Sequence, residues 1–332
     1  MIDIREHGGI FGGKKSSLDL IPNDYTIPVY VNLGSYPHLA LAKNIAFFRG
    51  NQYHCDSIDI MNGTKVASIT ENIDFPFMLT DEYDNMLYGY TYDYTVGNYR
   101  FRAYDSTFKK VWECTDTTNF GRIALLTKDF ILALYDKGIK KIDRKTGAIL
   151  STTSQKTIDI SVSYTVGTND KQTELVIVDL FNNLFIIDID TLLIIKQIKL
   201  QNVFLTHYTP YGVAILKGVL HLFRRESQTS EVGHCAFDLN GTSFDININS
   251  LFYYKLGREG NNRLTTQTVK VFNNCLAAAV SGRILLASYE KNKSLKTASI
   301  ESSHISCAQI NRNHYMNIRY TGQSIEKGKV KL

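Results

Sequence analysis

Apolar residues along this chain recur in short alternating runs that are separated by tight-turn signals. The stretch YDKGIKKIDRKTGAILSTT, residues 135–153, shows the pattern, with the run IKKID between turns at Asp136-Lys137-Gly138 and Lys145-Thr146-Gly147. Polar residues followed by glycine are typical of turns, and such a short framed run is typical of a strand. No stretch longer than about twelve residues keeps the i, i+3, i+4 apolar spacing of a helix. The pattern therefore predicts an all-β protein.

The same order of strand, turn, strand and second turn recurs along the whole chain. The first turn of each copy falls near residues 50, 97, 138, 183, 218, 282 and 322, at intervals of 47, 41, 45, 35, 64 and 40 residues. A period of roughly 40–50 residues is typical of the four-stranded blades of a β-propeller. Each small sheet has two apolar faces, which only neighbouring sheets in a ring can bury. The repeat predicts a seven-bladed β-propeller.

The two ends of the chain are predicted to meet in one blade. The last copy, which begins at His314, runs out of chain after its third strand, and the strand-like segment YTIPVYVNL, residues 25–33, precedes the first full blade. We expect this segment to complete the last blade. Residues 1–24 then form an N-terminal arm and residues 25–332 a single propeller domain, with an insertion at about 240–264 filling the longest interval. A β-sandwich with a second β domain is the alternative, because it also uses short strands and frequent turns.

Composition supports a globular, strand-rich protein and excludes several classes. Hydrophobic residues make up 44% of the 332 residues, with twenty Tyr and seventeen Phe, and the net charge of +5 is spread along the chain. There is no run of 18 apolar residues, no apolar signal segment and no basic stripe interleaved with aromatics, so we expect no membrane span and no nucleic-acid partner. The five cysteines lie far apart without a C-x-x-C, which argues against disulfides and zinc and for folding in a reducing cytoplasm.

Motifs for catalysis are lacking in the sequence. It contains no P-loop, no G-x-G-x-x-G, no G-x-S-x-G and no H-E-x-x-H, so we expect neither enzymatic activity nor a cofactor or metal. Asp188 and Asp190 have the spacing of a carboxylate pair, but they fall at a blade turn. His221, in VLHLF, is interpreted as a core or interface histidine, and the acidic group at 81–84 as part of a strand-linking turn.

The segment IDRKTGAIL resembles the Asp-x-x-Thr-Gly turn of quinoprotein-like (PQQ-type) repeats, and FIIDIDTLLII and IDIMNGTKVASI are looser versions of it. The resemblance implies propeller blades in which the Asp and Thr side chains satisfy backbone donors and the Gly is left-handed. Members that use the cofactor stack the quinone on Trp beneath a vicinal disulfide. This chain has one Trp, Trp112, and no adjacent cysteines, so no quinone is expected.

The N-terminal stretch MIDIREHGGIFGGKKSSLDLIPNDY does not follow the blade pattern. Its opening resembles the start of certain tailed-bacteriophage and prophage proteins, many of them virion components, which begin with a short IREHGG-type arm. The resemblance implies that the arm contacts a neighbouring subunit through Arg5, Glu6, His7, Gly8, Gly9 and Phe11. The alternative is that the apolar residues of the arm pack back on its own propeller, because exposing them would be costly.

We therefore predict a non-enzymatic structural propeller of a phage virion (tail, collar or neck), made in the host cytoplasm and docked through its arm and rim loops. Its partners would be other virion or assembly proteins, or further copies of the chain. Aromatic residues suit such contacts, and the candidates are Tyr90, Tyr92, Tyr94, Phe252, Tyr253 and Tyr254. A receptor- or glycan-binding propeller is the main alternative, and a lyase or hydrolase with a site at the channel mouth is a third.

Overall fold

Strands account for all the regular secondary structure in the described part of the chain. The computed structural model describes residues 19–28, 38–51, 54–70, 79–80, 83–93, 95, 98–114, 120–135, 138–154, 164–179, 181–203, 208–226, 231–246, 252–258, 268–272, 275–280, 283–289, 295–301, 305–310, 314–319 and 324–331. Within these ranges there is no helix, as the absence of helical spacing predicted.

The described strands form seven antiparallel sheets of four strands each, which we number in chain order. Sheet 1 contains β2 (His38–Leu41), β3 (Ile45–Asn51), β4 (His54–Asp59) and β5 (Lys65–Ile69), and sheet 2 contains β6 (Leu79–Thr80), β7 (Leu87–Asp93), β8 (Asn98–Tyr104) and β9 (Lys110–Glu113). Sheet 3 contains β10 (Phe120–Leu126), β11 (Phe130–Tyr135), β12 (Gly138–Asp143) and β13 (Ile149–Ser154), and sheet 4 contains β14 (Tyr164–Thr168), β15 (Glu174–Asp179), β16 (Asn183–Asp188) and β17 (Ile194–Lys199).

The remaining three sheets come from the second half of the chain and its beginning. Sheet 5 contains β18 (Tyr208–Leu216), β19 (Val219–Glu226), β20 (Glu231–Asp238) and β21 (Phe252–Arg258), and sheet 6 contains β22 (Thr268–Phe272), β23 (Cys275–Val280), β24 (Arg283–Tyr289) and β25 (Leu295–Glu301). Sheet 7 contains β26 (Ile305–Ile310), β27 (His314–Arg319), β28 (Ser324–Lys331) and, as its outermost strand, β1 (Asp19–Pro28).

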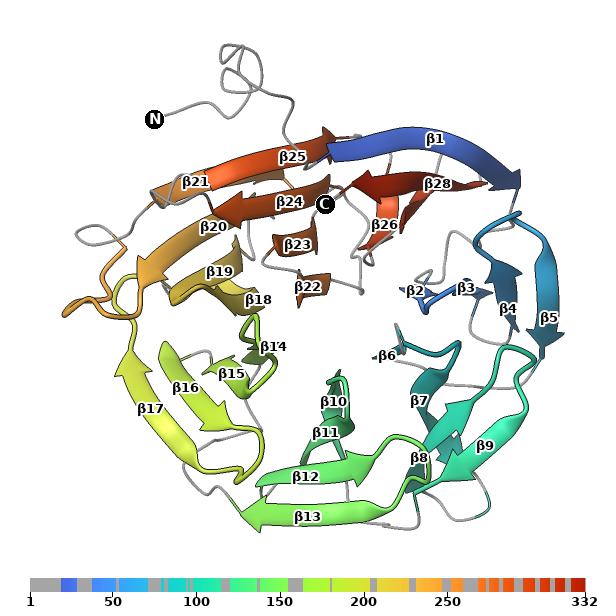
Figure 1. The fold of residues 1–332 in the computed structure, drawn as a ribbon, viewed down its shortest axis with the longest axis horizontal. Coiled ribbons are helices and arrows are strands. Elements are labelled where there is room, and N and C mark those ends of the chain that lie inside the picture. The colour runs from blue at the N-terminus through green and yellow to red at the C-terminus, as the bar shows by residue number, and fades with distance from the viewer. Residues whose placement is uncertain are drawn as a thin grey trace.

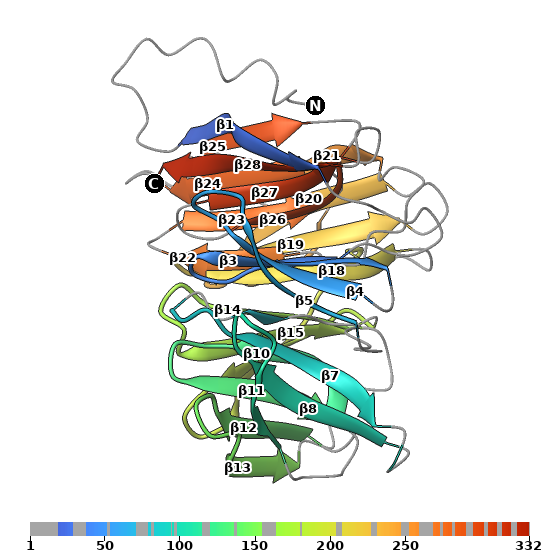
Figure 2. The ribbon, with the colours of Figure 1, turned by 90° about the vertical axis from the view of Figure 1, so that its right-hand side faces the viewer.

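The sheets follow one another around a common axis (Figure 1). In sheets 1 to 6 the first strand lies nearest the axis and the fourth lies at the periphery, so β5, β9, β13 and β17 form the outer side of the first four sheets (Figure 1). Seen from the side, sheets 1 and 2 lie next to each other with β5 and β7 toward the viewer (Figure 2). This radial arrangement lets each sheet bury both faces against its neighbours.

The core consists of apolar layers between neighbouring sheets, and β15 shows how the sequence builds it. Leu175 and Ile177 pack with apolar residues of sheet 3, whereas Val176 and Val178, which alternate with them, pack with residues of sheet 5. Successive side chains of a strand point to opposite faces, so a strand buried on both faces is a continuous apolar run. The segment LVIV is such a run.

Sheet 7 brings the two ends of the chain together. β1 pairs antiparallel with β28, for example Ile27 with Ile325, and Ile325 packs with Met316 against apolar residues of sheet 1. The strand predicted at 25–33 overlaps β1 only at residues 25–28, because β1 begins at Asp19, and residues 29–33 lie outside the described residues. Pro22 lies in the irregular part of the pairing, and an outermost strand tolerates a missing backbone donor.

Sheet 5 explains the longest interval of the sequence repeat. The Lys217-Gly218 turn that served as its marker joins β18 to β19, the first and second strands, whereas in the other sheets the marker lies at the connection between the second and third. Lys217 and Gly218 both have positive φ, as a two-residue hairpin loop requires. The Lys-Gly pair was therefore a correct turn signal, but it marks a connection that comes one strand earlier than the marked turns of the other sheets. In addition, β21 (Phe252–Arg258) lies within the stretch 240–264, so part of that stretch is the outer strand of the sheet.

Candidate interaction surface

The residues predicted for partner contacts are only partly within the described structure. Those that lie outside it are Arg5, Glu6, His7, Gly8, Gly9, Phe11 and Tyr94. Tyr90 and Tyr92 belong to β7 and pair with Phe101 and Tyr99 of β8. They therefore occupy positions inside a sheet, in its second strand.

The aromatic residues of the expected insertion are also strand residues. Phe252, Tyr253 and Tyr254 begin β21, where they pair with Ala236, Cys235 and His234 of β20. Tyr90 and Tyr92 are thus in an extended segment, as their alternation suggested, whereas Phe252, Tyr253 and Tyr254 belong to an outer strand and not to an insertion. Their role in partner binding stays a prediction.

A turn that begins with aspartate joins the third and fourth strands of sheets 1 to 4. We call it the aspartate turn, and its first residues are Asp59, Asp105, Asp143 and Asp188. In the third copy, Oδ1 of Asp143 accepts hydrogen bonds from the backbone N–H groups of Lys145 and Thr146, at 2.9 and 2.8 Å, and from the Thr146 hydroxyl, at 3.0 Å. Gly147 follows with a φ of +73°. These are the roles that the Asp-x-x-Thr-Gly resemblance implied.

Two of the four aspartate turns place an apolar side chain where the others have glycine. Leu192 has a φ of +57° and Phe108 a φ of +63°, a conformation that costs about 1–2 kcal/mol for a residue with a Cβ. Both side chains are buried in the apolar layers between sheets, Leu192 between sheets 3 and 4 and Phe108 between sheets 1 and 2. Burial of a large apolar side chain offsets that strain.

The aspartate turns of sheets 2, 3 and 4, and the corresponding turn of sheet 5, also accept a hydrogen bond from the preceding sheet. The acceptor is the backbone carbonyl of the residue directly after the turn aspartate, which we call the turn carbonyl. The donors and their turn carbonyls are Ser57 Oγ to Ser106 (2.6 Å), Trp112 Nε1 to Arg144 (3.0 Å), Lys141 Nζ to Ile189 (3.3 Å) and Lys196 Nζ to Leu239 (2.9 Å). The last of these reaches the corresponding turn of sheet 5, which begins with Asp238.

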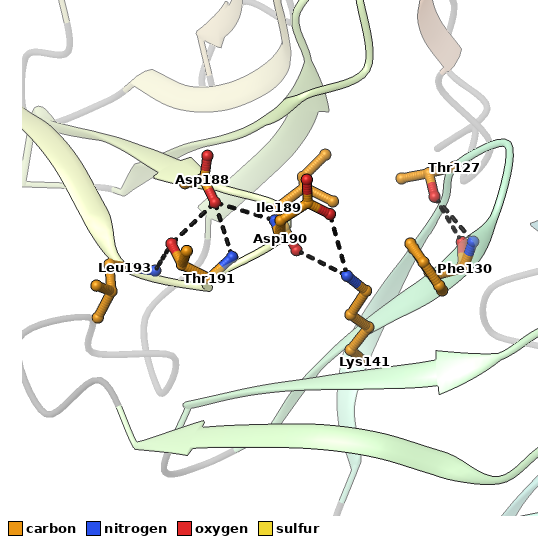
Figure 3. A network of polar contacts seen from close by, with 8 residues as sticks. All are labelled: Thr127, Phe130, Lys141, Asp188, Ile189, Asp190, Thr191 and Leu193. Carbon is orange, nitrogen blue, oxygen red and sulfur yellow. Dashed lines mark hydrogen bonds and ion pairs between the residues drawn. The ribbon is translucent and has the colours of Figure 1, made fainter.

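Figure 3 shows the contact between sheets 3 and 4. Lys141, which is buried on β12, donates to the carbonyl of Ile189 and lies 3.4 Å from Oδ1 of Asp190 (Figure 3). Its ammonium group also lies 3.8 Å from the centre of the Phe130 ring, within the range of a cation–π contact. Burial removes the ammonium group of Lys141 from water, which is costly unless polar partners replace its hydration. The neighbouring turn supplies those partners.

Asp188 and Asp190, which have the sequence spacing of a carboxylate pair, both take part in the contacts of this turn. Oδ1 of Asp188 accepts from the backbone N–H and the hydroxyl of Thr191, at 2.7 and 2.8 Å, while Asp190 contacts Lys141 (Figure 3). These hydrogen bonds from Thr191 hold the pKa of Asp188 below its ordinary value, because they favour the charged form. The interpretation of the two aspartates as turn residues is confirmed.

The interpretation of His221 as a core residue is also confirmed. Its side chain is fully buried, as is that of His234, and Nδ1 of His221 lies 3.1 Å from Nε2 of His234. Phe223 stacks on the His234 ring at 4.2 Å between centroids. Burial lowers the pKa of His221 to about 3, so both imidazoles are neutral near pH 7 and share a hydrogen bond.

The outer strands of sheets 1 to 4 share a β-bulge directly after the aspartate turn. In β5, for example, Ala67 and Lys65 pair with Ser57 and Ile58 of β4, which leaves Val66 as the extra residue. The same shift of register occurs at the corresponding point of β9, β13 and β17. The extra residues, which we call the rim belt, are Val66, Val111, Leu150 and Ile195, with exposed fractions of 43%, 50%, 50% and 55%.

Other exposed apolar side chains gather around the rim belt. Of the eight large exposed apolar residues in the described part of the chain, seven lie in an aspartate turn or the first residues of an outer strand. The three besides the rim belt are Met61, Ile149 and Leu193. The eighth, Phe181, lies in the connection between β15 and β16. Single exposed apolar residues are ordinary, but a gathering of them marks a contact surface.

A signal for the rim belt is present in the sequence. Each rim-belt residue follows its turn aspartate by six or seven positions, as Val111 follows Asp105 and Leu150 follows Asp143. An apolar residue in a strand is ordinarily assigned to the alternating core pattern. A bulge shifts that alternation by one residue, so the outward position was not evident before the pairing was known.

Within the described ranges there is no helix that could span a membrane, and no group of three or more residues arranged to bind a metal. The cysteines whose side chains are described are Cys55, Cys114 and Cys235, all buried and free. Burial raises the pKa of Cys235 to about 12, so its thiol is protonated and unreactive near pH 7.

Comparison with solved structures shows the fold class. The structure aligns with the WD40 domain of coronin from Toxoplasma gondii with a TM-score of 0.62 at 11% identity, covering 95% of this chain and 88% of that one. It aligns with BamB from Moraxella catarrhalis with a TM-score of 0.50 at 10% identity, covering 93% and 97%. No family model and no curated protein sequence matches the chain. The resemblances to quinoprotein-like repeats and to phage proteins stay predictions. What the comparison of structures shows is that the chain has a β-propeller fold.

Proposed function

We propose that this protein is a non-catalytic propeller that binds another protein through the rim belt of sheets 1 to 4. The observation that carries the proposal is the gathering of seven of the eight large exposed apolar residues of the described chain in the aspartate turns and the first residues of the outer strands of four sheets, where the rim-belt position repeats. Apolar side chains exposed at this level favour burial against a partner by roughly 25 cal/mol for each Å² covered.

A rigid platform is part of the proposal. We infer that the seven sheets act as seven blades of a closed ring, in which the N-terminal strand completes the last blade. The pairing of β1 with β28 and the packing of Met316 and Ile325 against sheet 1 support this inference. A ring that is rigid before binding loses little conformational entropy when a partner docks on it.

The residues with candidate chemistry support a binding role in preference to a catalytic one. Asp188 is held by its own turn, Asp190 contacts Lys141, and His221 and His234 are buried against each other. Groups that satisfy one another within the fold are engaged in structure, whereas a catalytic group must reach its substrate.

The virion hypothesis is more specific and rests on other residues. It depends on the opening of the chain, including Arg5, His7 and Phe11, which lies outside the described residues. The docking of a phage tail, collar or neck protein through this arm, and the alternative of glycan binding, stay predictions.

Affinity capture from cells of the source organism tests the proposed function. The full chain is compared with a variant that carries Val66→Ser, Val111→Ser, Leu150→Ser and Ile195→Ser, and with the matched control Phe181→Ser. We expect a partner that the wild-type chain and the control retain and the four-site variant loses. Equal retention by all three proteins, each shown to be folded by circular dichroism, would contradict the proposal.

A further inference from the structure

Exposed lysines lie close to the rim belt in the sequence of each sheet, although Lys196 and Lys199 also donate hydrogen bonds within the protein. Among the exposed residues of the four aspartate turns and their outer strands, the cationic ones are Lys65, Lys109, Lys110, Lys145, Lys196 and Lys199, and the only anionic one is Asp190. The aspartates that open the turns are half-buried, since their carboxylates accept hydrogen bonds from the turn's own backbone. The exposed charged groups of this surface are therefore mainly ammonium groups, which lie among aliphatic and uncharged polar side chains.

Some of these lysines have nearby carboxylates, which limits but does not remove their availability. Lys110 lies 3.1 Å from Glu113, and Lys65 lies 3.4 Å from Asp56. Both ammonium-bearing side chains are more than half exposed, at 52% and 60%. Exposed ion pairs of this kind contribute at most about 1 kcal/mol, so a partner carboxylate can share or replace either contact.

The shape of the surface favours a protein segment over a membrane. β5, β9, β13 and β17 lie on the outer side of four sheets that succeed one another around the axis, so their outer sides face in different directions (Figure 1). A flat bilayer meets such a curved surface at one or two sheets, whereas an extended polypeptide can follow it across all four. The repeat of the same apolar position in each sheet suits a segment with regularly spaced apolar residues.

We propose that the rim belt binds an acidic, extended segment of a partner protein, whose apolar side chains cover Val66, Val111, Leu150 and Ile195 and whose carboxylates face the adjacent lysines. This inference rests on the proposed function and specifies the chemistry of the partner. The apolar contacts supply affinity, and the lysines select a segment of negative charge and speed its association.

Peptide binding to the purified full chain tests the inference. The probe is a fluorescently labelled synthetic peptide of several Glu-Leu-Ser-Glu repeats, and its matched controls are Lys-Leu-Ser-Lys and Glu-Ser-Ser-Glu repeats of the same length. Fluorescence anisotropy is expected to show binding of the first peptide alone. High salt should weaken that binding several-fold, because it screens contacts between exposed charges.

Two variants separate the apolar and the ionic contributions. The four-site serine variant and a variant with Lys65→Gln, Lys109→Gln, Lys110→Gln and Lys145→Gln should each weaken binding on the order of tenfold or more. Phe181→Ser should leave it unchanged. Equal binding of the basic peptide, or acidic-peptide binding that neither variant alters, would overturn the inference.

A membrane is tested in the same series with vesicles of phosphatidylcholine and phosphatidylserine. Co-sedimentation that depends on the rim belt, together with no binding of the acidic peptide, would overturn the inference in favour of a lipid surface. A rim-belt-dependent protein partner whose contact segment is basic would overturn this inference and leave the proposed function standing. If no protein partner depends on the rim belt, both the proposed function and this inference are contradicted.

Discussion

Sheets 1 to 4 and sheet 5 use the same aspartate turn but continue from it differently. In sheets 1 to 4 the outer strand begins within a few residues of the turn and carries the bulge, as β13 does after Asp143. In sheet 5 the turn at Asp238 keeps its aspartate hydrogen bond, but the outer strand begins only at Phe252. In β21 the register shift lies near Leu256, toward the end of the strand that is farther from the aspartate turn in sequence.

The residues between that turn and β21 serve a different purpose. Gln201 donates its N–H to the carbonyl of Phe244 and accepts at its own carbonyl from the N–H of Ile246, and both apolar side chains are buried between sheets 4 and 5. The same turn can thus present an apolar residue to solvent or lead the chain into the layer between sheets. In sheets 1 to 4 the connection after the turn is short and an apolar residue faces solvent, whereas in the described part of sheet 5 the longer connection carries Phe244 and Ile246 into the layer between sheets.

The largest effect is expected at the turn of sheet 3. A Cβ at Gly147, where φ is +73°, would lie 2.5 Å from Cε3 of Trp112, so Gly147→Ala combines left-handed strain with a clash. We expect a loss of roughly 2–5 kcal/mol in the free energy of unfolding, measured by urea denaturation. Gly218→Ala is the matched control, since φ there is +75° and nothing lies within 4 Å. It should cost about 1–2 kcal/mol, and equal losses in both variants would contradict the role of Trp112.

Leu192 allows a test of the turns that lack glycine. Leu192→Ala removes a buried side chain but keeps the strain of a φ of +57°, and should cost about 3 kcal/mol in the free energy of unfolding. Leu192→Gly removes more of the side chain and also relieves the strain, so it should cost about 1 kcal/mol less than the alanine variant. An additional loss in the glycine variant would show that the backbone at this position is not under strain.

The turn carbonyls are tested by a pair of lysines. Lys141→Met keeps most of the packing but leaves the carbonyl of Ile189 without this donor in a buried place, which should cost about 1–2 kcal/mol in the free energy of unfolding. Lys196→Met removes the corresponding bond to Leu239 from an exposed lysine and should cost less than about 0.5 kcal/mol. A larger loss at Lys196 would reverse the ranking that burial predicts.

The smallest effect concerns pH. Thr191 lowers the pKa of Asp188, so the folded state binds that proton less readily than the unfolded state does. The stability that this carboxylate contributes is therefore present above about pH 4 and is lost as the pH falls through its folded-state pKa. Asp188→Asn keeps an acceptor oxygen without the charge. The difference in urea midpoint between wild type and this variant should shrink between neutral pH and pH values below about 4, and a constant difference would contradict the assignment.

The sequence indicated the aspartate turn, because similar residues recur in it from sheet to sheet. It did not indicate the donors to the turn carbonyls, because residues of different types make the same hydrogen bond. The role of Asp143, Thr146 and Gly147 was implied by the resemblance to the Asp-x-x-Thr-Gly turn, and it has a physical basis because short polar residues and glycine satisfy such a turn. The donors to the turn carbonyls could not be predicted, since serine, tryptophan and lysine share no pattern. Their equivalence comes from their place in neighbouring sheets.

Two further differences have physical reasons. The beginning of β1 at Asp19 was missed because Pro22 is ordinarily a sign against a strand, whereas an outermost strand accommodates it. The rim belt was missed because the bulge moves residues such as Leu150 out of the alternation that the sequence displays. In both cases the pairing of the strand, and not its composition, determines where a residue lies.

Site-specific photo-crosslinking tests the central claim, which is that the outer side of sheets 1 to 4 is a binding surface for another protein. A photoreactive amino acid is placed at Leu150 or, as the matched control, at Phe181, which is exposed to a similar degree in a different connection of the fold. In cells of the source organism, the account predicts a discrete adduct of higher mass from position 150 and none from position 181. No adduct at 150, or the same adducts from both positions, would contradict it.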